Sequence, residues 1–402
     1  MINVHSEIGK LNTVLVHRPG DEFKFIHPSM LAEQLFEDTP YLPSAQREHD
    51  SFTGILRNAG VEVLEQSELF TNVMRDDYLR SHFTDEYIAA SDIQSVGLAQ
   101  SLREYYDGLT VEKFVKTIYC GVRADNDAIR DTTTLAGLVS KQALFLVRPL
   151  TNTYFTRDSS IMLGDTDALA CMAKEERRRE PILMKYIIEN SAAFKGKPTK
   201  NLYNPRLQYA FEGGNVMVLN NKSVFIAVSQ RTEPEAIEAI ADPLFDHGFE
   251  NIYVVDLGQS REYMCLDDVL TQVDEATFIY NPLLSGTTPV FRVRPVYDDY
   301  PAAEFVSNDW RQALCEALGV EHVNLISAGG DDHFSSAWET WNMGSNVLAI
   351  APGEVVGLSR AEVTMDLLDK AGITVHTINA PELTRGRAGC RCMALPINRE
   401  EL

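Results

Sequence analysis

Cysteine is scarce in this chain, with six in 402 residues, and metal-binding motifs are missing. No pair of Cys-x-x-Cys or His-x-x-x-His units indicates a zinc site. Sparse cysteines are typical of a protein in a reducing compartment rather than of a disulfide framework. Long apolar runs are missing too, since segments such as Val347–Ala351 are far too short to span a membrane. The N-terminus shows no signal peptide, so we expect a cytoplasmic protein.

Basic residues are in the minority. The chain has 36 Lys and Arg against 58 Asp and Glu, a net charge of -22. This balance argues against nucleic acid and against an anionic membrane as partners. It suits a small cationic substrate, although many proteins are acidic for solubility alone. The apolar fraction of 45% is that of an ordinary globular protein with a substantial core.

A unit of helix, glycine and strand recurs along the chain. Helical periodicity over residues 46–59 ends at Gly60, and a strand is predicted over 61–64. The same pattern returns with helices over 176–195, 233–247, 309–318 and 360–371, although the second of the five units lacks a clear following strand. Such repetition favours radial or stacked modules. Because the spacing is irregular, a three-layer α/β fold stays an almost equal alternative.

Residues 75–145 have a different character. They predict successive helices without strands. We therefore expect an inserted helical domain over 75–145, with residues 1–74 and 146–402 forming the main α/β domain. No Pro/Ser-rich linker separates the two, so we expect them to share one body.

The loop from Pro381 to Pro396 contains two cysteines, Cys390 and Cys392, among arginines and glycines. Three arginines surround the cysteines, namely Arg385, Arg387 and Arg391. Fixed positive charge favours the thiolate, which is the nucleophilic form of cysteine. From the loop alone, a solvated basic tail with incidental cysteines is the simpler interpretation.

Carboxylates and another cysteine lie at the ends of predicted elements in separate modules, at Asp158, Glu212, Cys265 and Asp267. Each has an ordinary explanation when taken alone, such as capping a turn. Together they fit an active site at one mouth of a modular fold. Carboxylates bind a planar cation through paired hydrogen bonds, and a thiolate attacks its carbon.

Several motifs follow one another in a recognisable order. They are Val14-Leu-Val-His-Arg-Pro-Gly20, Phe155-Thr-Arg-Asp158, Phe211-Glu-Gly-Gly214, Arg231-Thr232, Leu266-Asp267, Trp341-Asn342, Asn346–Gly353, Glu382-Leu-Thr-Arg-Gly-Arg387 and Cys392-Met393. In these motifs, over nearly its whole length, the chain resembles the bacterial arginine deiminases, members of the guanidino-group-modifying enzymes. The resemblance implies a five-bladed α/β propeller of ββαβ-type modules with an inserted helical domain.

The resemblance also implies roles for individual residues. Cys392 would attack the guanidinium carbon of L-arginine, ammonia would leave, and water would release citrulline from a thiouronium intermediate. Asp158 and Asp267 would hold the guanidinium, and Glu212 would lie beside the family's catalytic histidine. The implied substrate-binding residues are Asn152, Arg177, Arg231, the gating arginine Arg387, and Gly389. The family needs no metal and no organic cofactor, and we expect a homo-oligomer, either a dimer or a tetramer.

One departure from the family bears on catalysis. The family has a histidine as general acid/base where this chain has Cys265, in Met264-Cys265-Leu266-Asp267. A thiol among carboxylates is a poor base, so we expect slow or absent turnover of arginine. An amidinotransferase-like enzyme and an arginine-binding paralogue without turnover are the alternatives, unless another histidine such as His333 reaches the site. Two smaller departures are Asn215, where the family usually has Asp, and Cys390.

Overall fold

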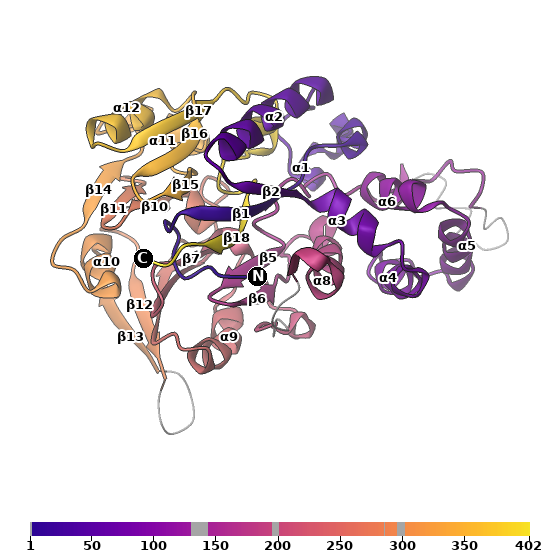
Figure 1. Ribbon diagram of the computed structural model, residues 1–402, viewed down its shortest axis with the longest axis horizontal. Helices are drawn as coiled ribbons and strands as arrows, with labels where there is room; N and C mark the ends of the chain where they lie inside the picture. Colours follow the sequence, from indigo (N-terminus) through magenta and orange to yellow (C-terminus); the bar gives the residue numbers. More distant parts are fainter. Residues whose placement is uncertain (1, 130–143, 195–200, 285, 296–301) are drawn as a thin grey trace.

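The computed structural model describes residues 2–129, 144–194, 201–284, 286–295 and 302–402, and it shows a mixed α/β fold (Figure 1). Four sheets share one pattern, in which a central strand has an antiparallel neighbour on one side and, after a helix, a parallel neighbour on the other. The central strands and the helices that follow them are β1 (Leu11–Val16) with α2 (Leu42–Asn58), β8 (Ser223–Val228) with α9 (Pro234–Asp246), β11 (Thr277–Tyr280) with α10 (Trp310–Leu318), and β16 (Glu354–Leu358) with α12 (Glu362–Lys370).

The outer strands of these sheets complete the pattern. The antiparallel neighbours are β18 (Leu395–Arg399), β7 (Val216–Val218), β10 (Leu270–Asp274) and β15 (Leu348–Ala351). The parallel neighbours are β2 (Glu62–Glu65), β9 (Asn251–Asp256), β14 (Asn324–Ser327) and β17 (Thr374–Ile378). Because β18 pairs with β1, the two ends of the chain lie in one sheet.

A glycine with positive φ follows each of the four helices, at Gly60, Gly248, Gly319 and Gly372. Glycine adopts this left-handed conformation at little cost, which is why it ends helices. The structure confirms these four predicted units of helix, glycine and strand. The remaining unit has β5 (Ser160–Leu163) and β6 (Thr166–Leu169) followed by α8 (Glu180–Asn190), and its predicted stop at Gly196 lies outside the described residues.

The five-bladed arrangement is not confirmed. The described strands form separate open sheets, and none of these closes on itself. In addition, β12 (Val290–Arg294) and β13 (Ala302–Ser307) extend one sheet beyond the repeated pattern, in the order β13-β12-β9-β8-β7. Among the described helices, none has the length and apolar character needed to cross a membrane.

The helical segment extends to one side of the sheets (Figure 1). It consists of α3 (Gln66–Val73), α4 (Asp77–Ala89), α5 (Val96–Asp107) and α6 (Val111–Cys120). The expectation that residues 75–145 lack strands is wrong, because β3 (Val122–Arg123) pairs with β4 (Phe145–Val147). Residues 130–143 of this range lie outside the described part. The helices share one apolar cluster with α8 and β18, which includes Phe70, Phe114, Met184 and Leu395.

His17, directly after β1, links the sheets to α6. Its ring stacks on Tyr119 at 4.7 Å between centroids. Its Nε2 lies 3.2 Å from Glu22 Oε1, and its Nδ1 lies 3.2 Å from Glu65 Oε1. Burial disfavours the charged ring, but these two carboxylates outweigh burial and raise the pKa of His17 from 6.5 to about 9.

This raised pKa predicts a loss of stability in alkali. The contribution of His17 is complete below pH 6.5 and disappears as the pH rises through about 9. The free energy of unfolding of the unmodified protein should therefore fall by at most about 3 kcal/mol across this interval because of His17. In His17→Gln that part of the fall should be absent, as measured by urea denaturation at several pH values. His376→Gln, which removes a half-exposed pair with Glu354, is the control and should keep the slope. Equal slopes in the unmodified protein and His17→Gln would contradict the assignment.

Candidate active site

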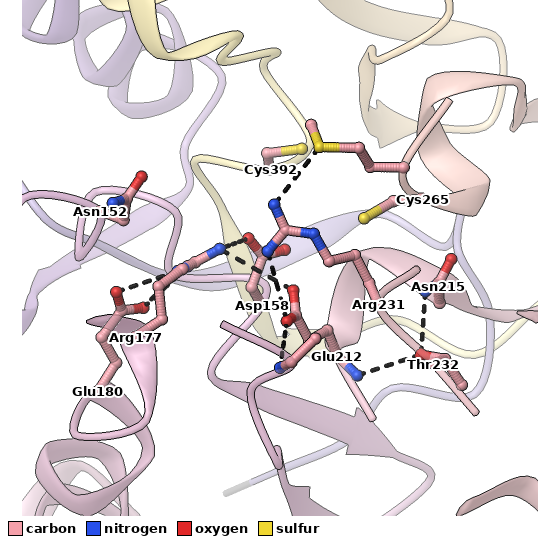
Figure 2. Close-up of polar contacts among 12 residues, drawn as sticks. Asn152, Asp158, Arg177, Glu180, Glu212, Asn215, Arg231, Thr232, Cys265 and Cys392 are labelled. Carbon is pink, nitrogen blue, oxygen red and sulfur yellow. Dashed lines mark hydrogen bonds and ion pairs between the residues drawn. The ribbon is translucent and has the colours of Figure 1, made fainter. Parts of the chain in front are cut away.

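Most of the predicted site residues surround one small cavity of about 40 Å³. Its lining includes Asn152, Phe155, Asp158, Arg177, Glu212, Arg231, Met264, Cys265, Asp268, Met343, Gly386, Arg387 and Cys392. Figure 2 shows how Asp158, Glu212, Arg231 and Cys392 come from separate segments to this site. No histidine is among the described lining residues. His333 is exposed at the start of α11 (His333–Trp341), so it does not supply the missing acid/base.

Cys392 is positioned by the amide of Asn346. Asn346 Nδ2 donates to Cys392 Sγ at 3.0 Å, and Asn346 Oδ1 accepts from the backbone N–H groups of Arg391 and Cys392 at 3.1 Å each. Gly389 does not line the cavity. A Cβ at this position would lie 2.2 Å from Asn346 Oδ1, so the glycine allows Asn346 to approach the loop that carries the nucleophile.

The expectation that loop arginines favour the thiolate is wrong for the structure. Burial raises the pKa of the Cys392 thiol well above its usual value, and Asp267 and the other nearby carboxylates raise it further. Two of the three loop arginines are already paired with carboxylates. Arg391 pairs with Glu7 at 2.9 Å and with Asp267 at 2.8 Å, and Arg385 pairs with Glu382 at 2.8 Å. Cys392 is therefore protonated until another cation arrives.

Asp158 lies just before β5, in a turn rather than at the end of the predicted strand-like run. Its Oδ2 accepts from Arg177 Nη1 at 2.8 Å, and its buried Oδ1 accepts no hydrogen bond from the described residues. Arg177 is held in turn by Glu180, with contacts of 2.8 to 3.1 Å (Figure 2). Asp158 thus keeps one oxygen for a ligand while Arg177 occupies the other.

Glu212 and Arg231 form a second half-satisfied pair. Glu212 Oε1 accepts from the Ala173 backbone N–H at 2.9 Å and lies 3.5 Å from Arg231 Nη1. The buried Glu212 Oε2 has no hydrogen bond from the described residues, and the same holds for Nε and Nη1 of Arg231. Arg231 Nη2 donates to the sulfur of Met264 at 3.4 Å, its one hydrogen bond among the described residues. This pair therefore offers both an acceptor and donors to a bound molecule.

Asp267 touches the nucleophile without being part of the cavity lining. Its Oδ2 accepts from Arg391 Nη1 at 2.8 Å and from Cys392 Sγ at 3.4 Å. Its Oδ1 is buried and accepts no hydrogen bond in the described structure. Burial raises the pKa of Asp267 to about 7, although Arg391 opposes the shift.

Cys265 precedes the short 3₁₀ helix Leu266–Asp268, and its backbone N–H donates to Asp268 Oδ2 at 3.1 Å. Asn215 holds the next residue, accepting from the Leu266 N–H at 2.9 Å. The Asn215 amide donates to Thr232 Oγ1 at 2.9 Å (Figure 2). Burial raises the pKa of Cys265 well above its usual value, and the nearby carboxylates add to the rise. Cys265 is therefore a neutral thiol.

Two residues contribute to the site in ways that the sequence did not predict. Asn346 had no assigned function, and Arg391 was expected as a free loop charge. Their partners lie far away along the chain, since Asn346 contacts Cys392, 46 residues on, and Arg391 contacts Glu7, 384 residues back. The one local signal was Gly389, because a glycine beside a nucleophile permits close approach of another group.

Comparisons with known proteins place the chain among relatives. A family described as Arginine deiminase matches residues 32–399. The arginine deiminase of Clostridium perfringens is 36% identical over 407 residues, covering 100% of this chain and 98% of that protein. The chain belongs to the arginine deiminase family. The arginine deiminase of Streptococcus sanguinis is also 36% identical, over 100% of this chain and 99% of its own length.

Solved structures agree on the fold. An amidinotransferase from Microseira wollei has a TM-score of 0.52 at 15% identity, covering 100% of this chain and 98% of its own. A mutant of DDAH from Pseudomonas aeruginosa, complexed with citrulline, has a TM-score of 0.51 at 11% identity and covers 96% of this chain and 99% of its own. At such low identities these likenesses support the mixed α/β fold alone.

The site predicts selective chemistry at Cys392. A haloacetamidine carries a positive charge, and the carboxylate-rich cavity should attract it and favour the thiolate of Cys392. We expect alkylation roughly tenfold faster than with a neutral haloacetamide of matched intrinsic reactivity, with the label located by mass spectrometry. Cys390 is the internal control, because it is fully buried two residues away and outside the cavity. A label found mainly on Cys390 would contradict the assignment of the nucleophile.

Proposed function

We propose that this protein hydrolyses the guanidino group of L-arginine, giving L-citrulline and ammonia through a covalent intermediate on Cys392. One observation carries the proposal. Three buried carboxylate oxygens near the thiol, Asp158 Oδ1, Glu212 Oε2 and Asp267 Oδ1, accept no hydrogen bond from the described residues. Buried acceptors without donors are unfavourable, and a planar guanidinium brings several N–H donors at once. Membership in the arginine deiminase family supports the same substrate.

The other end of arginine needs donors for its α-carboxylate. Arg231 supplies Nε and Nη1, which are buried without hydrogen-bond partners in the described structure. Asn152 also lines the cavity, and its Nδ2 donates to the Gln34 carbonyl at 2.9 Å. We assign Arg231, Asn152 and Arg177 to the carboxylate end of the substrate and Arg387 to the opening of the site. Gly389 has no side chain, which lets Asn346 approach closely and donate to Cys392 Sγ.

The first half of the reaction requires a thiolate. Arrival of the guanidinium adds the positive charge that the resting site lacks around Cys392. The thiol proton passes to Asp267 Oδ2, 3.4 Å away. Sulfur bonds to the guanidinium carbon, and the C=N π electrons move to nitrogen. Asp267 returns the proton to the departing nitrogen, the C–N bond breaks, and ammonia leaves a thiouronium on Cys392.

The second half consumes water. Its oxygen bonds to the thiouronium carbon while a base takes one proton. The C–S bond then breaks, its electron pair returns to sulfur, and the sulfur recovers a proton as citrulline forms. No electron acceptor is needed, and water supplies the oxygen of the product. This half depends on a base near neutrality, which is the task of histidine in the family.

Cys265 serves this task poorly. Its pKa is raised well above the usual thiol value, so it can donate a proton but rarely accepts one from water. Asp267, with a pKa of about 7, is the remaining acid/base group that touches Cys392, and its Oδ2 is shared with Arg391. We therefore propose slow steady-state turnover, with the thiouronium on Cys392 accumulating.

An imidazole at position 265 should restore the second half of the reaction, in which water releases citrulline from Cys392. General acid/base groups contribute about 10²- to 10⁴-fold, so Cys265→His should raise steady-state citrulline production by that order. Cys265→Ser is the matched control, because its hydroxyl has no pKa near neutrality, and its rate should stay at or below that of the unmodified protein. Rapid citrulline production by the unmodified, reduced protein would overturn the account of Cys265.

Removing one clamp carboxylate should weaken arginine binding. Asp158→Asn loses a charge that faces the substrate, and a lost partner in a desolvated pair costs about 2–5 kcal/mol of binding free energy. Calorimetry on a Cys392→Ser background would measure this loss without turnover. Glu180→Gln is the control, since Glu180 also holds Arg177 but does not line the cavity. An equal loss in both variants would mean that Asp158 acts only by positioning Arg177.

A transfer reaction is the second candidate, and the missing imidazole favours it. If no group activates water efficiently, an amine, which needs no activation, can attack the thiouronium carbon in place of water. The amidino group would then move to the amine and ornithine would leave in the first half. Mass spectrometry of products formed with and without an amine separates the reactions: citrulline without an acceptor supports hydrolysis, and an amidino-amine with ornithine supports transfer.

The wider organisation also remains a proposal. The four complete strand–helix–strand sheets and the β5–β6 pair support a five-bladed propeller of residues 1–74 and 146–402, with 75–145 as an inserted helical domain. Six free thiols suit a cytoplasmic protein. Family membership supports a homo-oligomer, a dimer or tetramer, without metal, organic cofactor, nucleic acid or membrane. Light scattering in solution would measure the number of copies.

A further inference from the structure

Arg387 joins three segments that surround the site. It follows the 3₁₀ helix η8 (Leu383–Gly386) in the terminal loop, with a positive φ of 61°. Its Nη1 donates to the Arg261 carbonyl, and its Nη2 donates to the Glu262 carbonyl at 2.8 Å, in the loop before Cys265. Its guanidinium carbon lies 4.3 Å from the ring centroid of Trp341, the last residue of α11.

Trp341 covers Arg387 from the outside. The tryptophan is 40% exposed, whereas Arg387 is only 3% exposed and lines the cavity. The chain then runs from Trp341 through Met343, which also lines the cavity, to Asn346, which holds Cys392. The same short connection therefore contacts the outer wall of the cavity at one end and the nucleophile at the other.

The cavity is too small for the proposed substrate. A volume of about 40 Å³ holds a few water molecules and not an amino acid with a guanidino side chain. A wall must therefore move before a molecule of that size reaches Cys392.

The backbone of the terminal loop is poorly suited to this movement. Glu48 accepts from the N–H groups of Glu382 and Leu383 at 3.0 and 2.9 Å. Arg360 donates to Thr384 Oγ1 at 2.9 Å, and its guanidinium stacks on Trp338 at 5.7 Å. These contacts tie η8 to α2 and α11. The side chain of Arg387, held by two carbonyls and one ring, is the part that can swing without breaking them.

We propose that Trp341 is the latch of the site, a positioning residue whose ring holds Arg387 over the cavity and so controls access to Cys392. A cation held against tryptophan and shielded from water is bound more firmly than one in solution. The Asp268 carboxylate, which also lines the cavity, attracts the charge of Arg387, but among the described residues no hydrogen bond or ion pair joins Arg387 to a side-chain oxygen. Removing the Trp341 ring therefore leaves both carbonyl contacts and the charge of Asp268 unchanged.

The test measures how fast a small neutral haloacetamide alkylates Cys392 in the full chain without arginine. Trp341→Ala should increase this rate by about fivefold to thirtyfold, the shift expected on losing a desolvated cation–π contact. Trp341→Phe, which keeps a weaker ring, should give a smaller increase. In an Arg387→Ala background, Trp341→Ala should add nothing. The rates concern access to the thiol, so they stand apart from whether arginine is hydrolysed.

Two controls separate a latch from a general loss of stability. Phe334→Ala changes a residue of α11 that is 82% exposed, and it should leave the rate unchanged. Cys390, fully buried two residues before Cys392, reports loosening of the whole loop. Faster labelling of Cys392 with Cys390 still protected supports the latch. An unchanged rate, equal acceleration at both cysteines, or an undiminished effect of Trp341→Ala in the Arg387→Ala background would overturn it.

Discussion

The site depends on one buried cation, Arg391. Its guanidinium is fully buried and donates to Glu7 at 2.9 Å, to Asp267 at 2.8 Å and to the Val216 carbonyl at 2.7 Å. These partners belong to the N-terminal segment, to the turn after Cys265 and to β7. A charge removed from water is tolerated only when it is fully paired, and loss of one partner typically costs about 3–5 kcal/mol. Because the next residue is Cys392, this ion pair helps to fix the position of that cysteine.

The same ion pair sets the electrostatics of the site. Arg391 satisfies Oδ2 of Asp267, and Arg177 satisfies Oδ2 of Asp158. Each carboxylate thereby keeps its other oxygen for a ligand, while its partner arginine is locked in place. The remaining negative charge opposes ionisation of Cys392. The resting site thus favours the arrival of a further cation, and a guanidinium would donate to the free oxygens and favour the thiolate.

Local signals predicted the repeated units well. Gly60, Gly248, Gly319 and Gly372 end helices because their positive φ suits glycine, and this can be read from a few neighbouring residues. The strands of β3 and β4 were missed because they are short and pair across a gap of more than 20 residues in the sequence. Likewise, nothing in the repeated pattern indicates that β12 and β13 extend the β9 sheet.

The structure brings most of the predicted site residues together around one cavity, while their roles stay predictions and the charge around Cys392 differs from the one expected. Carboxylates and thiols at element ends do gather around one cavity, as the resemblance implied. Arg391 was counted as a free charge because its partner cannot be seen locally: Glu7 is 384 residues away. The substrate-binding role of Gly389 stays a prediction, and the structure adds that its missing side chain makes room for Asn346. Partner choice over such separations is a property of the folded chain.

This chain has Cys265 where the family has a histidine. The replacement changes the acid/base group of the site while the surrounding hydrogen bonds remain. Asn215 holds this segment through the Leu266 N–H and the Thr232 hydroxyl, and Asp268 holds the N–H of Cys265 itself. The Cys265 side chain adds a capping contact to the Asp268 backbone, but the contacts through Asn215 and the Asp268 carboxylate use only backbone groups of residues 265 and 266 and do not depend on which side chain stands at 265. In the proposed reaction, capture of a guanidinium and attack by Cys392 would rest on Asp158, Glu212 and Asp267, all of which this chain keeps. Release of the product would rest on a base, so we expect the side chain at position 265 to affect how far the reaction proceeds rather than what is bound.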